Sequence, residues 1–271
     1  MRIFQYIPEF IKEPIRNLKG IAHPYGLPLS EFKRLRAFPR YQDTLVRFLE
    51  RDFQICDAAS FLHSHKEIFV ENIYSFETVS RNPVIFDVGA NVGLATVYFG
   101  QKFPGAKIIA IESDNRIVDI LRNNIDTYLL SNVEIHHGAA WKSNEDLHFS
   151  SDRADGGRLS NNGSEIVPGI RLLDLLKSHD LVDLLKMDIE GAETAVLEDC
   201  EPLLGRVERL FVEYHSIVGQ RQTLGAIISI LEKAGFRYYI DRACVQSPHP
   251  LIRRNVINEY DLQLNIFATR H

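Results

Sequence analysis

The chain has 271 residues, of which 45% are hydrophobic and 25% charged, and its formal net charge at pH 7 is −5. This balance excludes a largely disordered chain, and the acidic net charge argues against a general nucleic-acid coat, so we expect no nucleic-acid partner. No uninterrupted apolar run approaches the ~20 residues of a membrane-spanning helix. The short apolar stretch at the N-terminus, broken by Pro8 and Glu9, does not resemble a signal peptide. We therefore expect a cytoplasmic protein.

The cysteines are consistent with a reducing compartment. Cys56, Cys200 and Cys244 are odd in number and widely spaced, and no two of them form a Cys-x-x-Cys pair. A disulfide framework or a cysteine zinc site usually requires paired or closely spaced cysteines. The sequence predicts neither of them.

Residues 1–80 differ in amino-acid composition from the rest of the chain. They hold five of the eleven prolines, and basic residues outnumber acidic ones over residues 1–50. Apolar residues at helical spacing predict a helix over residues 41–59. We interpret residues 1–80 as a helix-containing N-terminal extension and residues 81–271 as the main domain. The apolar residues that define the predicted helix are Leu45, Phe48, Leu49 and Phe53.

The basic excess of the extension has two interpretations. A solvated surface is the simpler one. The alternative is peripheral contact with a membrane, through which the extension would approach an anionic or lipid-linked substrate. The sequence decides neither this question nor the oligomeric state.

From Pro83 onward, short apolar runs alternate with longer amphipathic segments. This alternation is typical of βαβ crossovers and predicts a doubly wound, mainly parallel α/β sheet. The predicted strands are residues 84–88, 107–112, 133–137, 182–189, 209–215, 236–240 and 262–268. The predicted helices are residues 92–103, 116–130, 192–204 and 222–234, and a polar Gly/Ser/Asn-rich loop covers residues 150–163.

A glycine-containing loop joins the first predicted strand of this domain to its first helix. It reads Asp87-Val-Gly-Ala-Asn-Val-Gly93. Gly89 and Gly93 permit a tight turn and let the backbone approach a ligand closely. A loop above the carboxyl ends of parallel strands is where open α/β sheets bind nucleotides. The alternative, a tight turn without a ligand, stays open.

The charge of this loop indicates which nucleotide it could bind. A dinucleotide fingerprint would need glycines at positions 87 and 92, and a Walker loop would need Gly-Lys-Ser/Thr; none of these is present. A carboxylate at Asp87 would repel a pyrophosphate at the helix N-terminus. The same carboxylate would favour a ligand with positive charge, and S-adenosylmethionine carries an ammonium and a sulfonium. We therefore expect this cofactor, and we disfavour a nicotinamide-dependent oxidoreductase.

Two further strand ends complete the predicted cofactor site. Glu112 ends the second strand and could accept hydrogen bonds from both hydroxyls of a ribose. After the third strand, Gly138 and Ala139 are small enough to leave room for an adenine ring. Trp141 could lie against that ring, and core packing is an equally open interpretation of this residue.

Polar residues interrupt two apolar strands further along the chain. Lys186 and Asp188 are two apart and share a face of a strand that should otherwise be buried, so we expect them to pair. Glu190 would join them if the chain stays extended. The next strand ends in Glu213 and His215, again two apart. Because the two strands should be neighbours, these side chains should converge beside the glycine loop.

Together these stretches resemble the FkbM family of methyltransferases. The resemblance rests on Val84-Ile-Phe-Asp-Val-Gly-Ala-Asn-Val-Gly93, Ala110-Ile-Glu112, Leu185-Lys-Met-Asp-Ile-Glu-Gly-Ala-Glu193 and Val212-Glu-Tyr-His215. It covers roughly residues 66–215. It implies a class I, Rossmann-like fold of seven strands with the last one antiparallel. It also implies S-adenosylmethionine-dependent methylation of a hydroxyl group on a sugar, a glycan or a polyketide-type natural product.

The cofactor residues predicted from these positions form one set. In this chain Ser113 and Asp114 follow Glu112 where the family often has a proline. The set is Asp87, Gly89, Ala90, Asn91, Gly93, Glu112, Ser113, Gly138, Ala139, Trp141 and Asp188.

Methyl transfer to an alcohol needs alignment of the reacting atoms and removal of the hydroxyl proton. The candidate bases are Asp188, Glu190 and His215, with His215 and Asp188 ranked equally. Lys186 would hold Asp188 ionised or stabilise negative charge on the acceptor oxygen. Glu213 completes the predicted catalytic group.

Two alternatives stay open. Asp188, Glu190, Glu213 and His215 could bind Mg²⁺ or Mn²⁺, although the nearby Lys186 argues against a cation, so we assign no metal. A non-catalytic module that only binds the cofactor is the other alternative, and the buried charges speak against it.

We expect the acceptor to be a small molecule or a glycan, and the sequence gives only weak information about its identity. The loop over residues 150–163 is polar and could cover the site, which suits a glycan better than an apolar polyketide. Four arginines could bind a phosphate or carboxylate of the acceptor, or could simply be solvated. They are Arg153, Arg158, Arg253 and Arg254.

Overall fold

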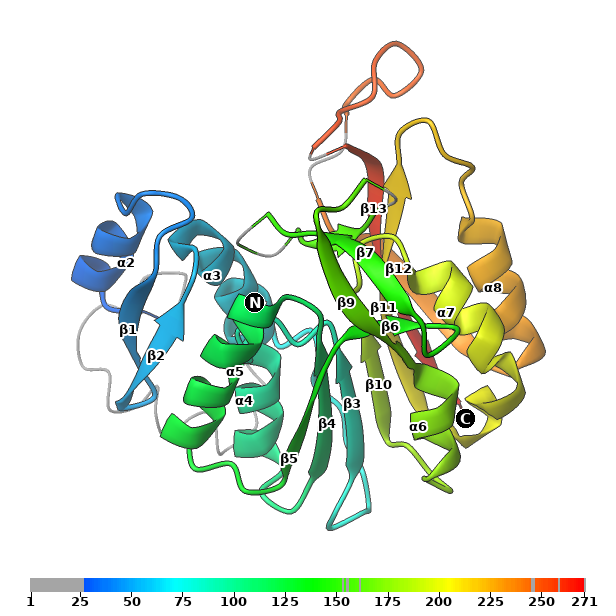
Figure 1. Cartoon of the computed structure of the whole chain (residues 1–271), viewed down its shortest axis with the longest axis horizontal. Coiled ribbons are helices and arrows are strands. Elements are labelled where there is room, and N and C mark those ends of the chain that lie inside the picture. The colour runs from blue at the N-terminus through cyan, green and yellow to red at the C-terminus, as the bar shows by residue number, and fades with distance from the viewer. Residues whose placement is uncertain are drawn as a thin grey trace, which may run out of the picture. The chain divides into compact units, whose positions relative to one another are not determined.

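The computed structural model describes residues 27–270 apart from residues 153, 155, 161, 245–246 and 258. Contacts within the chain divide it into two compact units, Met1–Ser75 and Phe76–His271. The division lies a few residues before the predicted boundary at residue 80. Figure 1 shows the elements of both units. Much of the segment for which we considered membrane contact, residues 1–26, lies outside the described residues.

The first unit contains a β-hairpin where the sequence predicted a helix. Strands β1 (Thr44–Phe48) and β2 (Arg51–Ile55) pair antiparallel, with Phe48 opposite Arg51. The two residues between them, Leu49 and Glu50, both have positive φ (46° and 65°), as a tight two-residue hairpin turn requires. The helix predicted over residues 41–59 is therefore wrong. Burial alternates along β1 with the period of a strand, so the helical spacing of the apolar residues was coincidental.

Helices flank this hairpin. Helix α2 spans Leu29–Arg36, and α3 spans Ala58–His65 and continues into a π-helix over Lys66–Glu71. Asp57 caps α3, because its side chain accepts a hydrogen bond from the Ser60 N–H at 2.9 Å. The core of the unit is aromatic. Phe48, Phe53 and Phe61 are buried and contact one another edge-on or tilted.

The second unit is built on a seven-stranded sheet in the order β12-β13-β11-β10-β3-β4-β5. The pairings among β11, β10, β3, β4 and β5 are parallel, whereas β13 pairs antiparallel with both β11 and β12. This is the predicted doubly wound sheet of seven strands with the last strand antiparallel. The strands are β3 (Val84–Val88), β4 (Lys107–Glu112), β5 (Val133–His137), β10 (Leu184–Met187), β11 (Arg209–Ile217), β12 (Arg237–Arg242) and β13 (Tyr260–Thr269).

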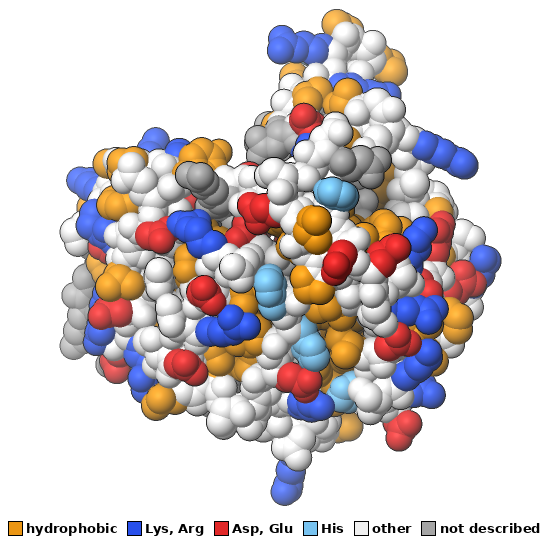
Figure 2. Space-filling view, in the orientation of Figure 1, with side chains coloured by type: hydrophobic (Ala, Val, Ile, Leu, Met, Phe, Trp, Pro, Cys, Tyr) orange, Lys and Arg blue, Asp and Glu red, His pale blue; other side chains and the backbone are white. Residues whose placement is uncertain are grey.

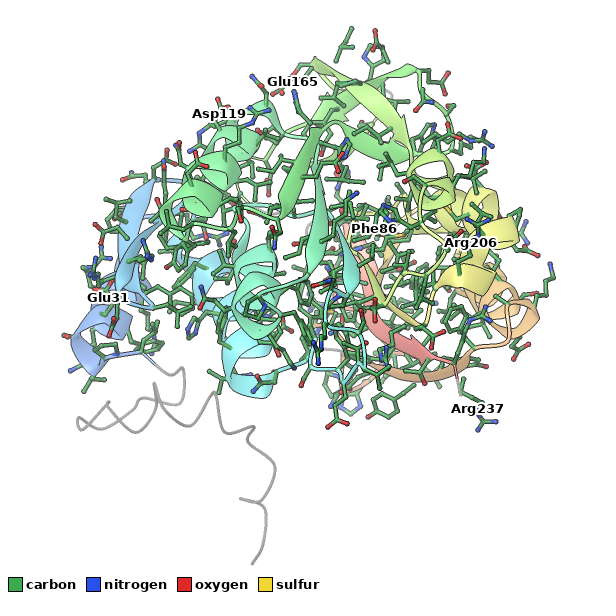
Figure 3. The ribbon with its side chains drawn as sticks, turned by 90° about the horizontal axis from the view of Figure 1, so that it is seen from below. Glu31, Phe86, Asp119, Glu165, Arg206 and Arg237 are labelled. Carbon is green, nitrogen blue, oxygen red and sulfur yellow. The ribbon has the colours of Figure 1, made fainter. Side chains whose placement is uncertain are left out.

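Helices cover both faces of this sheet. Figure 1 shows α4 and α5 on one face and α6, α7 and α8 on the other. Buried residues of the second group of helices pack on the sheet around Phe86, which lies in the interior, whereas Asp119 and Arg237 lie at the surface (Figure 3). The helices are α4 (Leu94–Lys102), α5 (Asn115–Thr127), α6 (Leu172–Lys177), α7 (Glu193–Cys200), a 3₁₀ helix over Glu201–Arg206, and α8 (Leu224–Lys233).

A second, four-stranded sheet was not predicted. Its order is β6-β9-β7-β8, and it occupies the region after β5. Two of its strands are very short, and β9 contains Pro168 and Gly169, residues that are depleted in strands, so this region has no clear strand pattern. Part of the predicted 150–163 loop belongs to it. The strands are β6 (Ala139–Trp141), β7 (Asp146–Ser150), β8 (Arg158–Leu159) and β9 (Glu165–Arg171).

Two further features concern the molecular surface and the lengths of the helices. On the face in Figure 2, acidic and basic side chains are interspersed. Among the described residues, no helix is long and apolar enough to span a bilayer.

Candidate active site

The glycine loop crosses the ends of β3 and β10. Gly89 and Gly93 have φ of 79° and 88°, in the left-handed region. A Cβ atom on Gly89 would lie 1.8 Å from the backbone oxygen of Asp188, so no larger residue fits without displacing the end of β10. The N–H groups of Gly89 and Ala90 donate to the Ile111 carbonyl at 3.0 and 2.9 Å. The tight turn predicted from the sequence is present, and it joins the ends of three strands.

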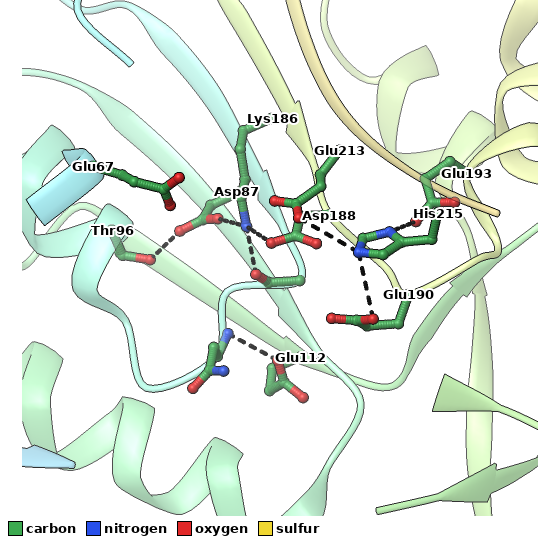
Figure 4. Close-up of polar contacts among 12 residues, drawn as sticks. Glu67, Asp87, Thr96, Glu112, Lys186, Asp188, Glu190, Glu193, Glu213 and His215 are labelled. Carbon is green, nitrogen blue, oxygen red and sulfur yellow. Dashed lines mark hydrogen bonds and ion pairs between the residues drawn. The ribbon is translucent and has the colours of Figure 1, made fainter. Parts of the chain in front are cut away.

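Glu112 links this loop to the loop after β4. One of its carboxylate oxygens accepts from the Asn91 N–H at 2.8 Å and the other from the Asp114 N–H at 2.8 Å (Figure 4 shows the first). Burial raises the pKa of Glu112, and these N–H donors oppose that rise. Asp114 in turn caps α5 through the N–H groups of Arg116 and Ile117, which explains an Asp at this position. A role of Glu112 and Ser113 toward a ribose stays a prediction.

Asp87 is a buried structural anion. It is fully buried, accepts a hydrogen bond from Thr96 Oγ1 at 2.6 Å, and lies 3.2 Å from Lys186 Nζ. Lys186 also donates to the Gly89 carbonyl at 2.6 Å, so it fastens the glycine loop (Figure 4). Because Lys186 balances its charge, Asp87 does not present a free carboxylate to a ligand. Asp87 is too deeply buried to contact a ligand, so the expectation that it selects a cationic ligand by direct contact is wrong.

Lys186 and Asp188 do lie on one side of β10, but Lys186 has closer partners. Its Nζ is 3.9 Å from Asp188 Oδ2 and 3.2 Å from Asp87 Oδ1. The register explains this preference, because Lys186 is paired directly with Asp87 across the β3–β10 ladder. Burial and the nearby Glu213 raise the pKa of Asp188 well above its usual value, and Lys186 only partly offsets them. Asp188 keeps 29% of its side chain exposed, so it faces an accessible space.

His215 lies at the centre of a group of carboxylates, as the sequence predicted for the ends of β10 and β11. Its Nδ1 is 2.9 Å from Glu193 Oε1, and its Nε2 is 3.5 Å from both Glu190 Oε2 and Glu213 Oε1 (Figure 4). Burial by itself lowers the pKa of His215, but Glu193, Glu213 and Glu190 outweigh it, and the pKa is raised well above its usual value. The surrounding carboxylates therefore favour the protonated form of the histidine.

Glu190 reaches this group by a different route from the one predicted. The chain does not stay extended, because Glu190 has φ 55° and Gly191 φ 105°. A non-glycine residue in the left-handed region is strained, and such residues are concentrated at functional sites. The turn brings the Glu190 carboxylate back toward His215. Burial is the main cause that raises the pKa of Glu190 to about 7.

Two residues of this group were missed at the sequence level. Glu193 is buried at the start of α7, and its Oε1 accepts from the Gly191 N–H at 2.9 Å as well as contacting His215. Its position three residues after Glu190 was an available signal. The ring of Tyr260, at the start of β13, lies 4.9 Å from the ring of His215. No pattern in the sequence pointed to Tyr260, because β13 joins the site only through the antiparallel pairing.

Strand β9 packs closely against the glycine that follows β5. A Cβ on Gly138 would lie 2.5 Å from the Pro168 carbonyl oxygen and 2.8 Å from Ile170, so no side chain fits at this position. A place for an adenine ring beside this loop stays a prediction. Ala139 is buried in a small cluster with Phe149 and Val167. Trp141 packs against the main core. Packing thus explains Gly138, Ala139 and Trp141 without a ligand, and the unpredicted second sheet is the reason.

The loop after β7 lies across the predicted cofactor loops. Ser151 Oγ donates to Asp114, and Asn91 Nδ2 donates to the Ala154 carbonyl at 3.3 Å. This agrees with the expectation that the 150–163 loop covers the site. Of the four arginines considered for the acceptor, Arg158 pairs with Glu259 and Arg254 with Asp261, Arg253 is exposed, and Arg153 lies outside the described residues.

A family of known proteins matches most of the second unit. Residues 87–238, more than half of the chain, match the family described as "Methyltransferase FkbM domain". The chain belongs to this family and is an S-adenosylmethionine-dependent methyltransferase.

Curated relatives and a solved structure carry similar names. The chain is 28% identical over 219 residues to methyltransferase sdnD of Sordaria araneosa, covering 66% of this chain and 83% of that protein. It is 26% identical over 217 residues to the 31-O-demethyl-FK506 methyltransferase FkbM of Streptomyces tacrolimicus, covering 66% and 82%. A crystal structure of methyltransferase FkbM from Methylobacillus flagellatus KT is 16% identical, covers 77% of this chain and 53% of that chain, and has a TM-score of 0.47.

Proposed function

We propose that this protein transfers a methyl group from S-adenosylmethionine to a hydroxyl oxygen of a sugar, a glycan or a polyketide-type natural product. The observation that carries this proposal is the carboxylate–histidine group at the ends of β10 and β11, beside the glycine loop. Such a group can accept the proton that an alcohol must lose. The relative from Streptomyces tacrolimicus is named as an O-demethyl-FK506 methyltransferase, which is compatible with an oxygen acceptor.

The residues around the glycine loop fit the cofactor. Gly89 leaves no side chain at the point where the loop meets the end of β10. Glu112 holds both adjoining loops in place through backbone N–H groups. The carboxylates of Asp188, Glu190 and Glu213 give this edge of the sheet a negative character that suits a cation. Gly89, Asn91, Glu112 and Asp188 are therefore the residues that would hold the cofactor.

When bound, S-adenosylmethionine supplies an electrophilic methyl carbon, whose bond to sulfur breaks as the acceptor oxygen bonds to it. The chain must orient the acceptor hydroxyl and take up its proton. His215 is less suited to this task, because its side chain is 1% exposed and surrounded by carboxylates. Asp188 is the better candidate, since it is partly exposed and its raised pKa makes it more basic than an ordinary carboxylate. His215 and Lys186 would then stabilise negative charge beside it.

The test is transfer of a labelled methyl group. The protein is incubated with labelled S-adenosylmethionine and a panel of sugars, glycolipids and macrolides, and mass spectrometry detects the added methyl group. We expect one acceptor to gain a single methyl group, and Asp188→Asn to lower the rate by a factor of about 10²–10⁴, the usual contribution of a general base.

The matched control is Asp180→Asn, the same substitution at a fully exposed aspartate before β10. It should leave the rate unchanged. Methylation of a nitrogen or carbon acceptor, with no hydroxyl compound modified, would contradict the proposal. Full activity of the Asp188→Asn variant would remove Asp188 as the base.

A further inference from the structure

We propose that Asp188, Glu213 and His215 form a binding site for a divalent metal ion of the Mg²⁺/Mn²⁺ class, which would bind the acceptor oxygen. This inference rests on the proposed function, because the ion would lie where the hydroxyl proton is lost. With the ion bound, Asp188 and His215 would act on that hydroxyl as ligands of the ion, and Asp188 would no longer act as a free base. One donor atom from each of the three side chains lies within 4.8 Å of the other two. Two carboxylate oxygens and one imidazole nitrogen are ligands suited to Mn²⁺.

The strongest evidence is the orientation of His215. Its side chain is 1% exposed, and its Nε2 makes no hydrogen bond, although it lies 3.5 Å from a carboxylate oxygen of Glu190 and of Glu213. A polar atom buried to this degree without a hydrogen bond costs free energy unless something binds it. Its Nδ1 is 2.9 Å from the Glu193 carboxylate. Histidines that bind metals usually donate their other N–H to a carboxylate in this way, which fixes the ring and directs the free nitrogen at the ion.

Glu193 is itself held in place. The oxygen that contacts His215 also accepts from the Gly191 N–H at 2.9 Å, and the side chain is 1% exposed. Such a carboxylate has no access to solvent or to an acceptor. Its position is explained by orienting the imidazole, so we assign Glu193 as a positioning residue and not as a metal ligand.

The charges around the site favour a cation. Asp188, Glu190 and Glu213 surround a single histidine. Glu190 Oε2 and Glu213 Oε1 each lie 3.5 Å from His215 Nε2, so several carboxylate oxygens meet at one imidazole nitrogen.

Lys186 seemed at the sequence level to oppose a metal, but its contacts reduce that objection. It lies 2.6 Å from the Gly89 carbonyl and 3.2 Å from Asp87, against 3.9 Å from Asp188. Its charge is thus largely balanced by Asp87 on the far side from Glu213 and His215. The side chains of Asp188 and Glu213 are 29% and 22% exposed, so an ion could reach them from solvent. The ion would then keep coordination positions open for the acceptor.

The test measures metal binding without methyl transfer. The full chain, stripped of metal, is titrated with Mn²⁺ by calorimetry and by electron paramagnetic resonance. We expect one Mn²⁺ ion to bind per chain. Glu193→Gln should weaken Mn²⁺ binding about 10–100-fold, as loss of such an orienting partner does.

The control is Glu198→Gln, an exposed glutamate on the same helix, which should bind Mn²⁺ like the wild type. If Glu193→Gln does not fold, as circular dichroism would reveal, Glu213→Gln is the second variant and should also weaken binding. Absence of stoichiometric Mn²⁺ binding, or unchanged affinity in both variants, would overturn the metal site. Because no step depends on turnover, an inactive enzyme that still binds Mn²⁺ would count against the proposed function and not against this inference.

Discussion

At the scale of single residues, Gly89 makes the most demanding geometric requirement of the site. A Cβ there would be 1.8 Å from the Asp188 carbonyl oxygen. We expect Gly89→Ala to push the glycine loop away from the end of β10, break the Lys186 hydrogen bond to its carbonyl, and lower the affinity for S-adenosylmethionine at least about 100-fold, or ~3 kcal/mol. Calorimetric titration of the folded variant measures this.

Gly219 offers a matched control for backbone strain. Its φ of 82° is close to the 79° of Gly89, yet a Cβ on it would meet nothing within 4 Å. Gly219→Ala should therefore cost only the ~1–2 kcal/mol of a left-handed alanine and leave cofactor affinity unchanged. Equal affinities in the Gly89→Ala and Gly219→Ala variants would refute the assignment of Gly89 to the cofactor loop.

Glu190 gives the site a pH dependence that stability measurements can detect. Its pKa in the folded protein is about 7, above the ordinary value of 4.5. Between these values the unfolded chain is already ionised while the folded chain still holds the proton, so folding stability falls as pH rises through this range. Glu190→Gln should remove this penalty. We expect the variant to gain on the order of 1–3 kcal/mol over the wild type at pH 8 and little at pH 4.5.

Urea unfolding of both proteins at several pH values tests this expectation. Glu198→Gln, on an exposed position of α7, serves as the control and should show no pH-dependent difference. A stability difference for Glu190→Gln that is constant from pH 4.5 to 8 would mean that Glu190 is not a strained, buried carboxylate.

At the scale of elements, the two ends of β10 have different tasks. Asp183, just before the strand, accepts from Thr78 Oγ1 at 2.6 Å and from the Val84 N–H at 2.9 Å, and thereby ties the start of β10 to that of β3. Asp188, just after the strand, belongs to the candidate site. Asp183→Asn should place an amide N–H₂ against one of these donors and destabilise the fold by about 1–3 kcal/mol.

Cofactor affinity should not change in the folded Asp183→Asn protein, because the site lies at the other end of the strand. Thermal unfolding and calorimetric titration separate the two effects. Loss of S-adenosylmethionine affinity with unaltered thermal stability would contradict this division of tasks.

Strands marked by a clear apolar run were predictable from the sequence, and elements defined by tertiary contacts were not. Strands β3, β4 and β5 have the bounds that the apolar runs indicated. The hairpin of β1 and β2 was misread because four apolar residues happened to fall at helical spacing. The second sheet was missed because its strands are short or contain Pro168 and Gly169, and the close packing of β9 on Gly138 was therefore not foreseen.

The sequence predicted which residues form the candidate site better than it predicted which of them contact one another. Spacing of two placed Lys186 with Asp188 and Glu213 with His215 on shared faces, and neighbouring strands brought the pairs together. Spacing cannot tell which partner is nearest. Lys186 pairs more closely with Asp87 on the adjacent strand, and Glu193 reaches His215 from a helix.

At the scale of the whole molecule, the residues of the candidate site lie on one side of the main sheet, at the carboxyl ends of its strands. The glycine loop, Glu112, Asp188 and His215 all follow or end strands at their carboxyl ends, where a doubly wound sheet opens its crevice. Ligand binding at this edge should stabilise the whole second unit, because the loops there are tied to β3, β4 and β10. Cofactor selectivity can therefore be tested through global unfolding.

S-adenosylmethionine at 100 times its dissociation constant should raise the free energy of unfolding by about 2.7 kcal/mol and Tm by roughly 5–10 °C. NAD at the same concentration should leave Tm unchanged, because the carboxylates of Asp188, Glu190 and Glu213 disfavour a diphosphate. This holds whichever residue of the glycine loop contacts the ligand. Differential scanning fluorimetry of the full chain measures both shifts, with the Gly89→Ala variant as the control, whose Tm should rise by a small fraction of the wild-type shift with S-adenosylmethionine and not at all with NAD. A Tm increase with NAD as large as that with S-adenosylmethionine would show that this edge of the sheet does not select a cation.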